Sequence, residues 1–508
     1  MAHRLRLYNV FPILHVLGMI VGVFGLSMLL PLTVSEWSDD AAQRAYDEAV
    51  LITLACGVAL WLVGRYWKRE LKARDGILLV VLTWTLTPLF AALPLLLYFP
   101  QLTFTDAYFE TMSGLTTTGA TVLSGLDRMP TSINLWRAQL HWLGGLGVIV
   151  LVVAVLPLLG VGGRQLYKAE TPGPMKDDKL TPRMAETAKG LWRVYILLTL
   201  LCIGLYWAFG MTPADAVIHA FSVMGLGGFS SHDASFGYFK SLPLELITEV
   251  FALLAGLNFA MHFMALRARS LTPYRVDPEI RWYFGYVLGS CLLLGLLLWR
   301  AGVYQDFPGA LRDASFSVIS MSTTLGLATA DFGAWPWFAG LWLLFLCSFS
   351  TSAGSTGGGI KMLRAVLLYK QVYRELLRVL HPRAELTIRL GEQVVPDKVM
   401  YAVLVFFFVY VASIVSLSFL LSLSGLDVLT AFSAIVACIN NTGPGLGQVG
   451  PSTTYAVLSD FQTWVCTFAM LLGRLELFTL LVVLTPAFWR RYIHHTSPSA
   501  NTSAARTV

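Results

Sequence analysis

The sequence predicts an all-α integral membrane protein in which four span–pore helix–span repeats surround a central pore, preceded by two extra spans. Three observations lead to this fold class. The first is composition: of 508 residues, 56% are hydrophobic and 13% are charged, and the mean hydropathy is +0.66. These values lie outside the range of soluble globular domains. The other two are a fourfold internal repeat and an uneven distribution of Lys and Arg.

Four stretches share one pattern, in which an Asp or Thr is followed by Ala and a Gly lies thirteen residues after the first position. The first residues are predicted to cap short helices, because Asp and Thr side chains accept hydrogen bonds from the first turn. These caps are Asp106, Asp215, Asp313 and Thr430. The Gly residues, which permit left-handed backbone, are Gly119, Gly228, Gly326 and Gly443. Equal spacing in four copies indicates four pore helices that lead into Gly-containing loops.

Apolar runs of span length give the predicted order of domains. Two extra spans occupy residues 1–70, and the repeats occupy 71–163, 164–270, 271–380 and 381–495. The second span of repeat three is the one span that we predict to be broken. The polar tail 496–508 is predicted to be disordered.

Charge predicts the orientation of the spans. Of the 36 Lys and Arg residues, 29 fall at the termini and in the loops that would lie on one side, 6 fall on the other side, and Arg474 lies inside the last span. The basic side is expected to be cytoplasmic. Both termini are then cytoplasmic, and the pore loops enter the membrane from outside.

Four such loops around one axis would place rings of carbonyl oxygens there, which can replace the hydration shell of a monovalent cation. The partly negative C-terminal ends of the pore helices would also favour a cation. In the second loop Gly227 is an alternative to Gly228, which the spacing favours. Asn441 would either supply an oxygen or brace its loop. The predicted filter residues are Thr117, Thr118, Gly119, Gly227, Gly228, Thr324, Leu325, Gly326, Asn441, Thr442 and Gly443.

A Ser/Gly-rich segment follows the short apolar run Pro336–Phe349, which has fourteen residues where a span needs about 20. The segment must therefore lie at membrane depth. We interpret it as an intramembrane gate loop below the filter, with a packing seam of small residues between helices as the alternative. The predicted gate residues are Ser350, Gly354, Ser355, Gly357, Gly358, Gly359, Lys361 and Arg474.

Arg474 is included because a charge inside a span is costly and usually functional. It is expected to form an electrostatic barrier to cations near the gate loop. The alternative is a structural ion pair with Glu476 or with another buried acid.

The chain resembles the Trk/Ktr/HKT superfamily of potassium transporters, and specifically its bacterial TrkH branch, over nearly its whole length. The stretches that carry the resemblance are GLTTTGAT (Gly114–Thr121), GGFSSHD (Gly227–Asp233), STTLGLATADF (Ser322–Phe332), SFSTSAGSTGGGIK (Ser348–Lys361), CINNTGPGLGQVGP (Cys438–Pro451) and GRLELFT (Gly473–Thr479).

This resemblance implies potassium uptake across a bacterial inner membrane, with one filter Gly in each repeat and no bound organic cofactor. It also implies a homodimer and a cytosolic ring of nucleotide-binding, TrkA-like regulatory subunits. The K⁺ sites that it implies are at Thr118, Gly119, Gly228, Gly326 and Gly443.

Other functions remain possible from the sequence. Leu325 stands where Thr is more typical of the family, which leaves open a weakly selective Na⁺/K⁺ pathway. Coupling to H⁺ or Na⁺ is also left open. A secondary transporter for organic solutes would have inverted repeats and paired broken spans, which the sequence does not predict. An enzyme is not expected, because the sequence contains no recognisable catalytic set or phosphate-binding loop.

Overall fold

The structure is a computed structural model that describes residues 11–66, 71–154, 181–349, 351–391 and 393–489. Within these residues the regular secondary structure is helical, apart from one short hairpin of β1 (Arg389–Leu390) and β2 (Gln393–Val394). Two predictions, the gate residue Ser350 and the disordered tail 496–508, lie outside the described residues.

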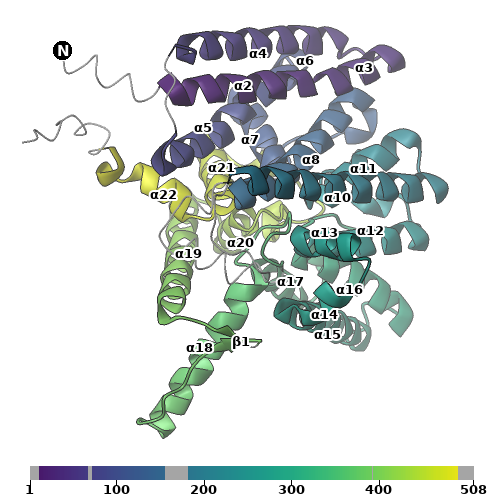
Figure 1. Ribbon diagram of the computed structural model, residues 1–508. Helices are drawn as coiled ribbons and strands as arrows, with labels where there is room; N and C mark the ends of the chain where they lie inside the picture. Colours follow the sequence, from purple (N-terminus) through teal and green to yellow (C-terminus); the bar gives the residue numbers. More distant parts are fainter. Residues whose placement is uncertain (1–10, 67–70, 155–180, 350, 392, 490–508) are drawn as a thin grey trace, which may run out of the picture.

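The N-terminal helices form an outer layer of the molecule, visible in Figure 1. Helices α2 (Phe11–Ser27) and α3 (Leu29–Ser38) make one span, and α4 (Gln43–Gly64) packs against α2. Glycines allow this close approach: a Cβ atom on Gly18 would lie 2.4 Å from the backbone nitrogen of Trp61. Small residues of this kind let membrane helices pack backbone to backbone.

Each of the four repeats begins with a long apolar helix. These first spans are α5 (Ala73–Ala91, continued by the short α6, Leu93–Tyr98), α10 (Thr181–Ala208), α15 (Pro278–Arg300) and α19 (Asp397–Leu423). Together with the two N-terminal spans they are the six helices in the described chain that are long and apolar enough to cross a membrane. The predicted fold class, two extra spans followed by four repeats, is therefore confirmed.

The pore helices follow the first spans. They are α7 (Phe104–Leu115), α11 (Pro213–Gly225), α16 (Phe307–Ser322) and α20 (Val428–Ile439). Their N-caps are Thr103, Thr212, Asp306 and Asp427, whose side chains accept hydrogen bonds from the backbone of residues three positions later.

The prediction that Asp106, Asp215, Asp313 and Thr430 are the caps is therefore wrong. Asp106, Asp215 and Thr430 are the third residues of their helices, and Asp313 lies inside α16. In the first two helices the Thr cap also donates its hydroxyl proton to the Asp carboxylate, at 2.8 Å. Each of these two helices thus begins with two polar residues three positions apart, and the first of the two is the cap.

The second spans of the repeats were predicted to contain one broken helix, but three of the four are interrupted. Helix α8 (Thr131–Ala154) is continuous, whereas the other three are interrupted. Helices α12 (Leu242–Ala255) and α13 (Phe259–Ala268) meet at 94°, and α21 (Asp460–Arg474) and α22 (Phe478–Leu484) meet at 117°. In repeat three, α17 (Trp337–Phe349) and α18 (Met362–Leu380) are separated by the Ser/Gly segment. Beyond α13, the short α14 (Thr272–Val276) leads into repeat three.

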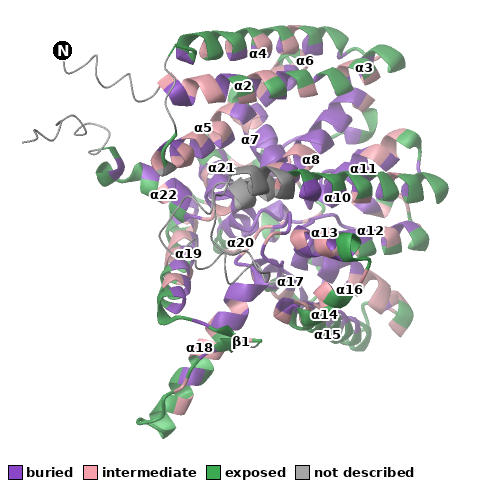
Figure 2. Ribbon diagram, in the orientation of Figure 1, coloured by how far each residue is buried: buried purple, intermediate pink, exposed green. Residues whose placement is uncertain are grey.

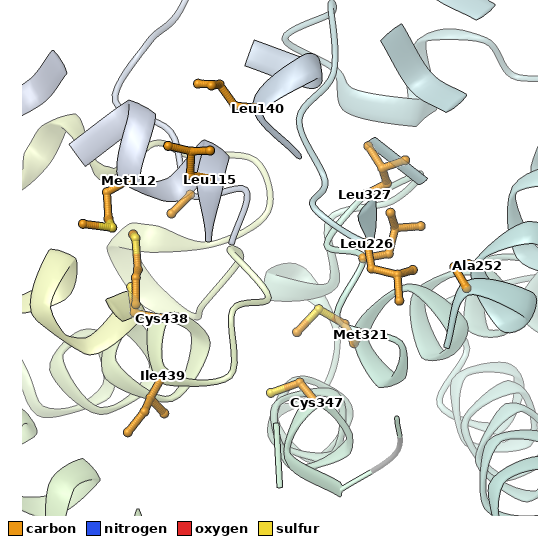
Figure 3. Close-up of a cluster of buried hydrophobic side chains, with 14 of the residues drawn as sticks. Met112, Leu115, Leu140, Leu226, Ala252, Met321, Leu327, Cys347, Cys438 and Ile439 are labelled. Carbon is orange, nitrogen blue, oxygen red and sulfur yellow. The ribbon is translucent and has the colours of Figure 1, made fainter. Parts of the chain in front are cut away.

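The C-terminal halves of the four pore helices are buried. Figure 2 shows α7, α20 and α21 as mainly buried, whereas the outer helices α4 and α15 expose one face. Apolar side chains from several repeats, among them Met112 of α7, Met321 of α16 and Ile439 of α20, surround the central loops (Figure 3). Helix α18 instead projects from the body (Figure 1), with Val379 and Leu380 exposed.

Candidate functional site

The loop after each pore helix has the same backbone conformation. In all four loops the Gly and the residue two positions before it are left-handed. The pairs and their φ angles are Thr117 (54°) with Gly119 (80°), Leu226 (53°) with Gly228 (85°), Thr324 (63°) with Gly326 (80°), and Asn441 (54°) with Gly443 (88°). This match places Gly228, and not Gly227, in line with the other three Gly residues. Left-handed backbone costs a non-Gly residue roughly 1–2 kcal/mol, so four equivalent strained positions indicate a constrained functional geometry.

Close contacts between neighbouring loops join the four into one closed ring, which we call the filter ring. A Cβ atom on Gly119 would lie 2.0 Å from the carbonyl oxygen of Gly227, in the second loop. The corresponding distances are 2.3 Å from Gly228 to the oxygen of Leu325, 2.2 Å from Gly326 to that of Thr442, and 2.6 Å from Gly443 to that of Thr118. Loop one thus contacts loop two, two contacts three, three contacts four, and four contacts one. Four Gly residues alternate with four carbonyl oxygens around the ring.

The polar side chains of the loops hold them in place. Asn441 Nδ2 donates to Thr118 Oγ1 at 3.0 Å and to the carbonyl of Met470 at 3.0 Å. Thr118 Oγ1 also pairs with Thr116 Oγ1 at 2.8 Å. The amide nitrogen of Asn441 thus braces the first and fourth loops, whereas its Oδ1 accepts no hydrogen bond from the described residues. In the described chain no group of three or more His, Cys, Asp or Glu side chains could hold a metal ion.

A cavity of about 260 Å³, which we call the vestibule, lies on one side of the filter ring. All four ring Gly residues line it, together with residues that follow them, such as Thr121, Ser230 and Pro444. The vestibule therefore lies on the side of the ring that is formed by residues following the filter Gly residues in the sequence.

A buried ion pair supports the ring next to the vestibule. Arg137 Nε lies 2.8 Å from Glu110 Oε1, and both side chains are 1% exposed. Arg137 also donates to the carbonyl of Ser230 at 3.1 Å and to Thr121 Oγ1 at 3.2 Å. Its guanidinium stacks 4.2 Å from the ring centroid of Phe229. The pair thus fixes the segments that follow the first and second filter Gly.

Replacing Arg137 by Met is expected to destabilise the protein by roughly 3–5 kcal/mol, because Glu110 would be left as a buried charge without its partner. The measurement is thermal unfolding of the detergent-solubilised protein. The control is Arg44→Met, which breaks the exposed pair between Arg44 and Glu48, where the two side chains are 91% and 44% exposed. Such a pair contributes about 0–1 kcal/mol. Equal effects of the two substitutions would contradict this role for Arg137.

Residues 351–361, which we call the Ser/Gly loop, lie against the opposite side of the filter ring. The backbone nitrogen of Gly358 donates to Thr324 Oγ1 at 2.9 Å, and Thr356 Oγ1 donates to the carbonyl of Met224 at 3.1 Å. A Cβ atom on Gly358 would lie 2.0 Å from the carbonyl oxygen of Asn440. These partners come from repeats two, three and four and precede the filter Gly residues, so the loop and the vestibule lie on opposite sides of the ring.

The Ser/Gly loop has an irregular conformation. Residues 351–361 are not helical, and Gly354 and Gly359 are left-handed. The side chains of Thr351, Ser352, Ser355 and Thr356 are buried, and the amine of Lys361 donates to the carbonyl of Gly357.

The break in the second span of repeat two, which was not predicted from the sequence, contacts the Ser/Gly loop. The backbone nitrogen of Ser352 donates to the carbonyl of Gly256 at 2.9 Å, and that of Phe259 donates to the carbonyl of Gly354 at 3.1 Å. Backbone groups at the end of α12 and the start of α13 therefore form hydrogen bonds with the loop. Asn258, which caps α13, is the local signal that could have revealed this break.

Arg474, at the end of α21, forms a hydrogen bond with the Ser/Gly loop. Its Nη1 donates to the carbonyl of Thr356 at 3.0 Å, and its Nη2 donates to the carbonyl of Gly144 at 2.9 Å. Glu476 is paired with Arg364 at 2.8 Å, so the alternative in which Glu476 is the partner of Arg474 does not hold. A buried positive charge therefore lies beside the Ser/Gly loop, bound to backbone carbonyls of two repeats.

Comparisons with known proteins agree with this architecture. A sequence model of the TrkH family, described as cation transport protein, matches residues 43–491. The Trk system potassium uptake proteins TrkH of Salmonella typhimurium and of Escherichia coli K12 are each 45% identical to this chain over 479 residues, which are 94% of this chain and 99% of the relative. The Trk system potassium uptake protein TrkG of Escherichia coli K12 is 40% identical over 483 residues, with 95% and 99% covered.

A solved structure shows the same fold. The crystal structure of the potassium transporter TrkH from Vibrio parahaemolyticus matches with a TM-score of 0.88 and 43% identity, covering 94% of this chain and 99% of that one. The chain is therefore a multi-pass membrane protein that belongs to the TrkH family of cation transport proteins.

Proposed function

We propose that this protein takes up K⁺ across the inner membrane through the filter ring. The observation that carries the proposal is the closed alternation of four Gly residues and four carbonyl oxygens. Carbonyl dipoles in such a ring replace the hydration shell of a monovalent cation without an anionic side chain. The potassium uptake stated in the names of the relatives supports K⁺ as the transported ion.

The hydrogen bonds of the loops support a backbone-lined site. Asn441 Nδ2 donates to Thr118 Oγ1, and Thr324 Oγ1 accepts a bond from the Ser/Gly loop, so these two hydroxyl oxygens have other partners than an ion. Leu325 occupies the position of Thr118 and is 1% exposed. Its carbonyl oxygen is retained in the ring, so the loss of a hydroxyl at this position does not remove a backbone ligand.

The Ser/Gly loop is proposed to be the gate. It lies against the ring on the side away from the vestibule and is bonded to three repeats and to Arg474. With the basic loops in the cytoplasm, the vestibule faces outward and the gate inward. Cations would then pass from the vestibule through the ring and be stopped at the loop until it moves.

Ion flux into liposomes that contain the purified protein tests the function. K⁺ and Rb⁺ are expected to enter at least about tenfold faster than Na⁺ under the same gradient, because one filter geometry suits ions of similar size. Protein-free liposomes give the background. Equal K⁺ and Na⁺ flux would instead support the weakly selective pathway, and the absence of cation flux above background would contradict the proposal.

A further inference from the structure

A histidine lies in the wall of the vestibule, four residues after the filter Gly of the second loop. His232 lines the same 260 Å³ cavity as the four ring Gly residues. Its side chain is 12% exposed. Because an imidazole changes its charge near neutral pH, it is the one type of side chain here whose protonation would vary under ordinary conditions.

Two carboxylates from different repeats flank the imidazole of His232. Its Nδ1 lies 2.6 Å from Asp127 Oδ1, in the segment that follows the first filter loop. Its Nε2 lies 3.3 Å from Asp215 Oδ1, in the first turn of α11, at an angle that makes no hydrogen bond. Tyr238 stacks on the imidazole with 3.5 Å between ring centroids. Protonated His232 therefore bridges repeat one and repeat two at the vestibule.

The other charged and titratable groups near His232 already have partners. Asp233 accepts hydrogen bonds from the backbone of Gly125 and Leu126. His219, whose ring centroid is 6.3 Å away, bonds to the carbonyl of Asp215 and to Ser230. The charge of Arg137, which also lines the vestibule, is balanced by Glu110. His232 is thus the titratable group in the vestibule wall that lies between two carboxylates.

The carboxylates also set the pH range of this change. Partial burial lowers the pKa of His232, but the hydrogen bond to Asp127 and the negative charges of Asp215 and Asp127 outweigh it and hold the pKa above the ordinary value. The hydrogen bond from His232 in turn holds the pKa of Asp127 below its usual value. The bridge is therefore fully formed at low pH and is lost as the pH rises through the raised pKa of His232.

We propose that His232, with Asp127 and Asp215, is a proton-binding site that controls how readily cations reach the filter ring from the vestibule. This proposal rests on the proposed function. A protonated His232 places a positive charge in the wall of the cavity that a cation must cross, and this charge lowers the local concentration of cations. Loss of the proton removes that charge and leaves the two carboxylates uncompensated. Both changes favour cations in the vestibule, so uptake rises as the outside pH rises.

The test is K⁺ flux into liposomes at fixed inside pH, with the outside pH varied from about 6 to about 9 to cross the range in which an imidazole loses its proton. Wild-type flux is expected to rise by roughly two- to tenfold, the effect of one charge near the ion path. His232→Gln keeps a neutral polar side chain and should give the high flux at every pH. The control His381→Gln changes an exposed histidine on the far end of α18 and should keep the wild-type profile.

Two further measurements separate this role from a purely structural one. Asp127→Asn removes one carboxylate and should move the midpoint of the wild-type profile to lower pH, even if His232→Gln does not fold. Raising the ionic strength should reduce the pH effect, because salt screens a charge that acts across a solvent-filled cavity. Wild-type K⁺ flux that does not vary with outside pH, or an Asp127→Asn midpoint that does not move, would overturn the proposal. Absence of any K⁺ flux in the wild type would instead overturn the proposed function.

Discussion

Replacing Gly119 by Ala is expected to abolish K⁺ uptake, with flux at least about a hundredfold below wild type. The added Cβ atom would lie 2.0 Å from the carbonyl oxygen of Gly227, well inside van der Waals contact. Either this carbonyl or the first loop must move, and both belong to the filter ring. The φ angle of Gly119, 80°, is also one that Ala resists. Because a filter depends on the positions of its oxygens, a shift of this size should remove conduction and selectivity together.

A matched control separates backbone strain from loss of the ring. Gly125 has nearly the same φ angle, 75°, but a Cβ atom there would have no atom within 4 Å. Gly125→Ala should therefore carry the strain without the collision and keep most of the K⁺ flux. The measurement is uptake by each variant in liposomes, with thermal unfolding to show that both proteins are intact. Wild-type selectivity in a folded Gly119→Ala protein would show that the ring is not the filter.

Replacing Arg474 by Ala is expected to raise resting cation flux by about tenfold. Arg474 is buried beside the Ser/Gly loop and bonds to the carbonyls of Thr356 and Gly144. Its removal takes away a positive charge that repels cations and one of the bonds that hold the loop under the ring. A charge in so dry a position acts strongly on a nearby ion.

The variant Arg474→Lys distinguishes the two contributions. Lys keeps the charge, but it cannot reproduce the paired donors with which the guanidinium contacts two carbonyls. Low flux in Arg474→Lys with high flux in Arg474→Ala would assign the effect to charge, and high flux in both would assign it to the hold on the loop. Resting flux in folded Arg474→Ala that is no higher than in wild type would exclude a gating role for this residue.

The repeats could be predicted because their backbone geometry requires particular residue types at fixed positions. A left-handed position beside a close contact requires Gly, and Gly119, Gly228, Gly326 and Gly443 recur at one spacing for that reason. The left-handed backbone of Leu226 could not be predicted, because nothing in the sequence marks a Leu as left-handed. Its role in the loop is clear only from the equivalent left-handed residues of the other three loops.

The missed features depend on contacts between distant parts of the chain. The break between α12 and α13 is stabilised by bonds to the Ser/Gly loop about a hundred residues later, so the cap residue Asn258 is its one local sign in the sequence. The bond between Asn441 and Thr118 joins residues 323 positions apart. The prediction of the helix caps was wrong for a different reason. In the first pore helix, for example, Thr103 and Asp106 are both suitable capping residues and lie less than one helical turn apart.

Anomalous X-ray diffraction from crystals grown with Rb⁺ in place of K⁺ tests the central claim most directly. Rb⁺ should occupy sites on the axis of the filter ring, surrounded by the carbonyl oxygens of Thr118, Gly227, Leu325 and Thr442. Crystals of the Gly119→Ala variant should lack these peaks. Rb⁺ bound elsewhere in the protein, with the ring empty in the wild type, would contradict the assignment of the four loops as the filter.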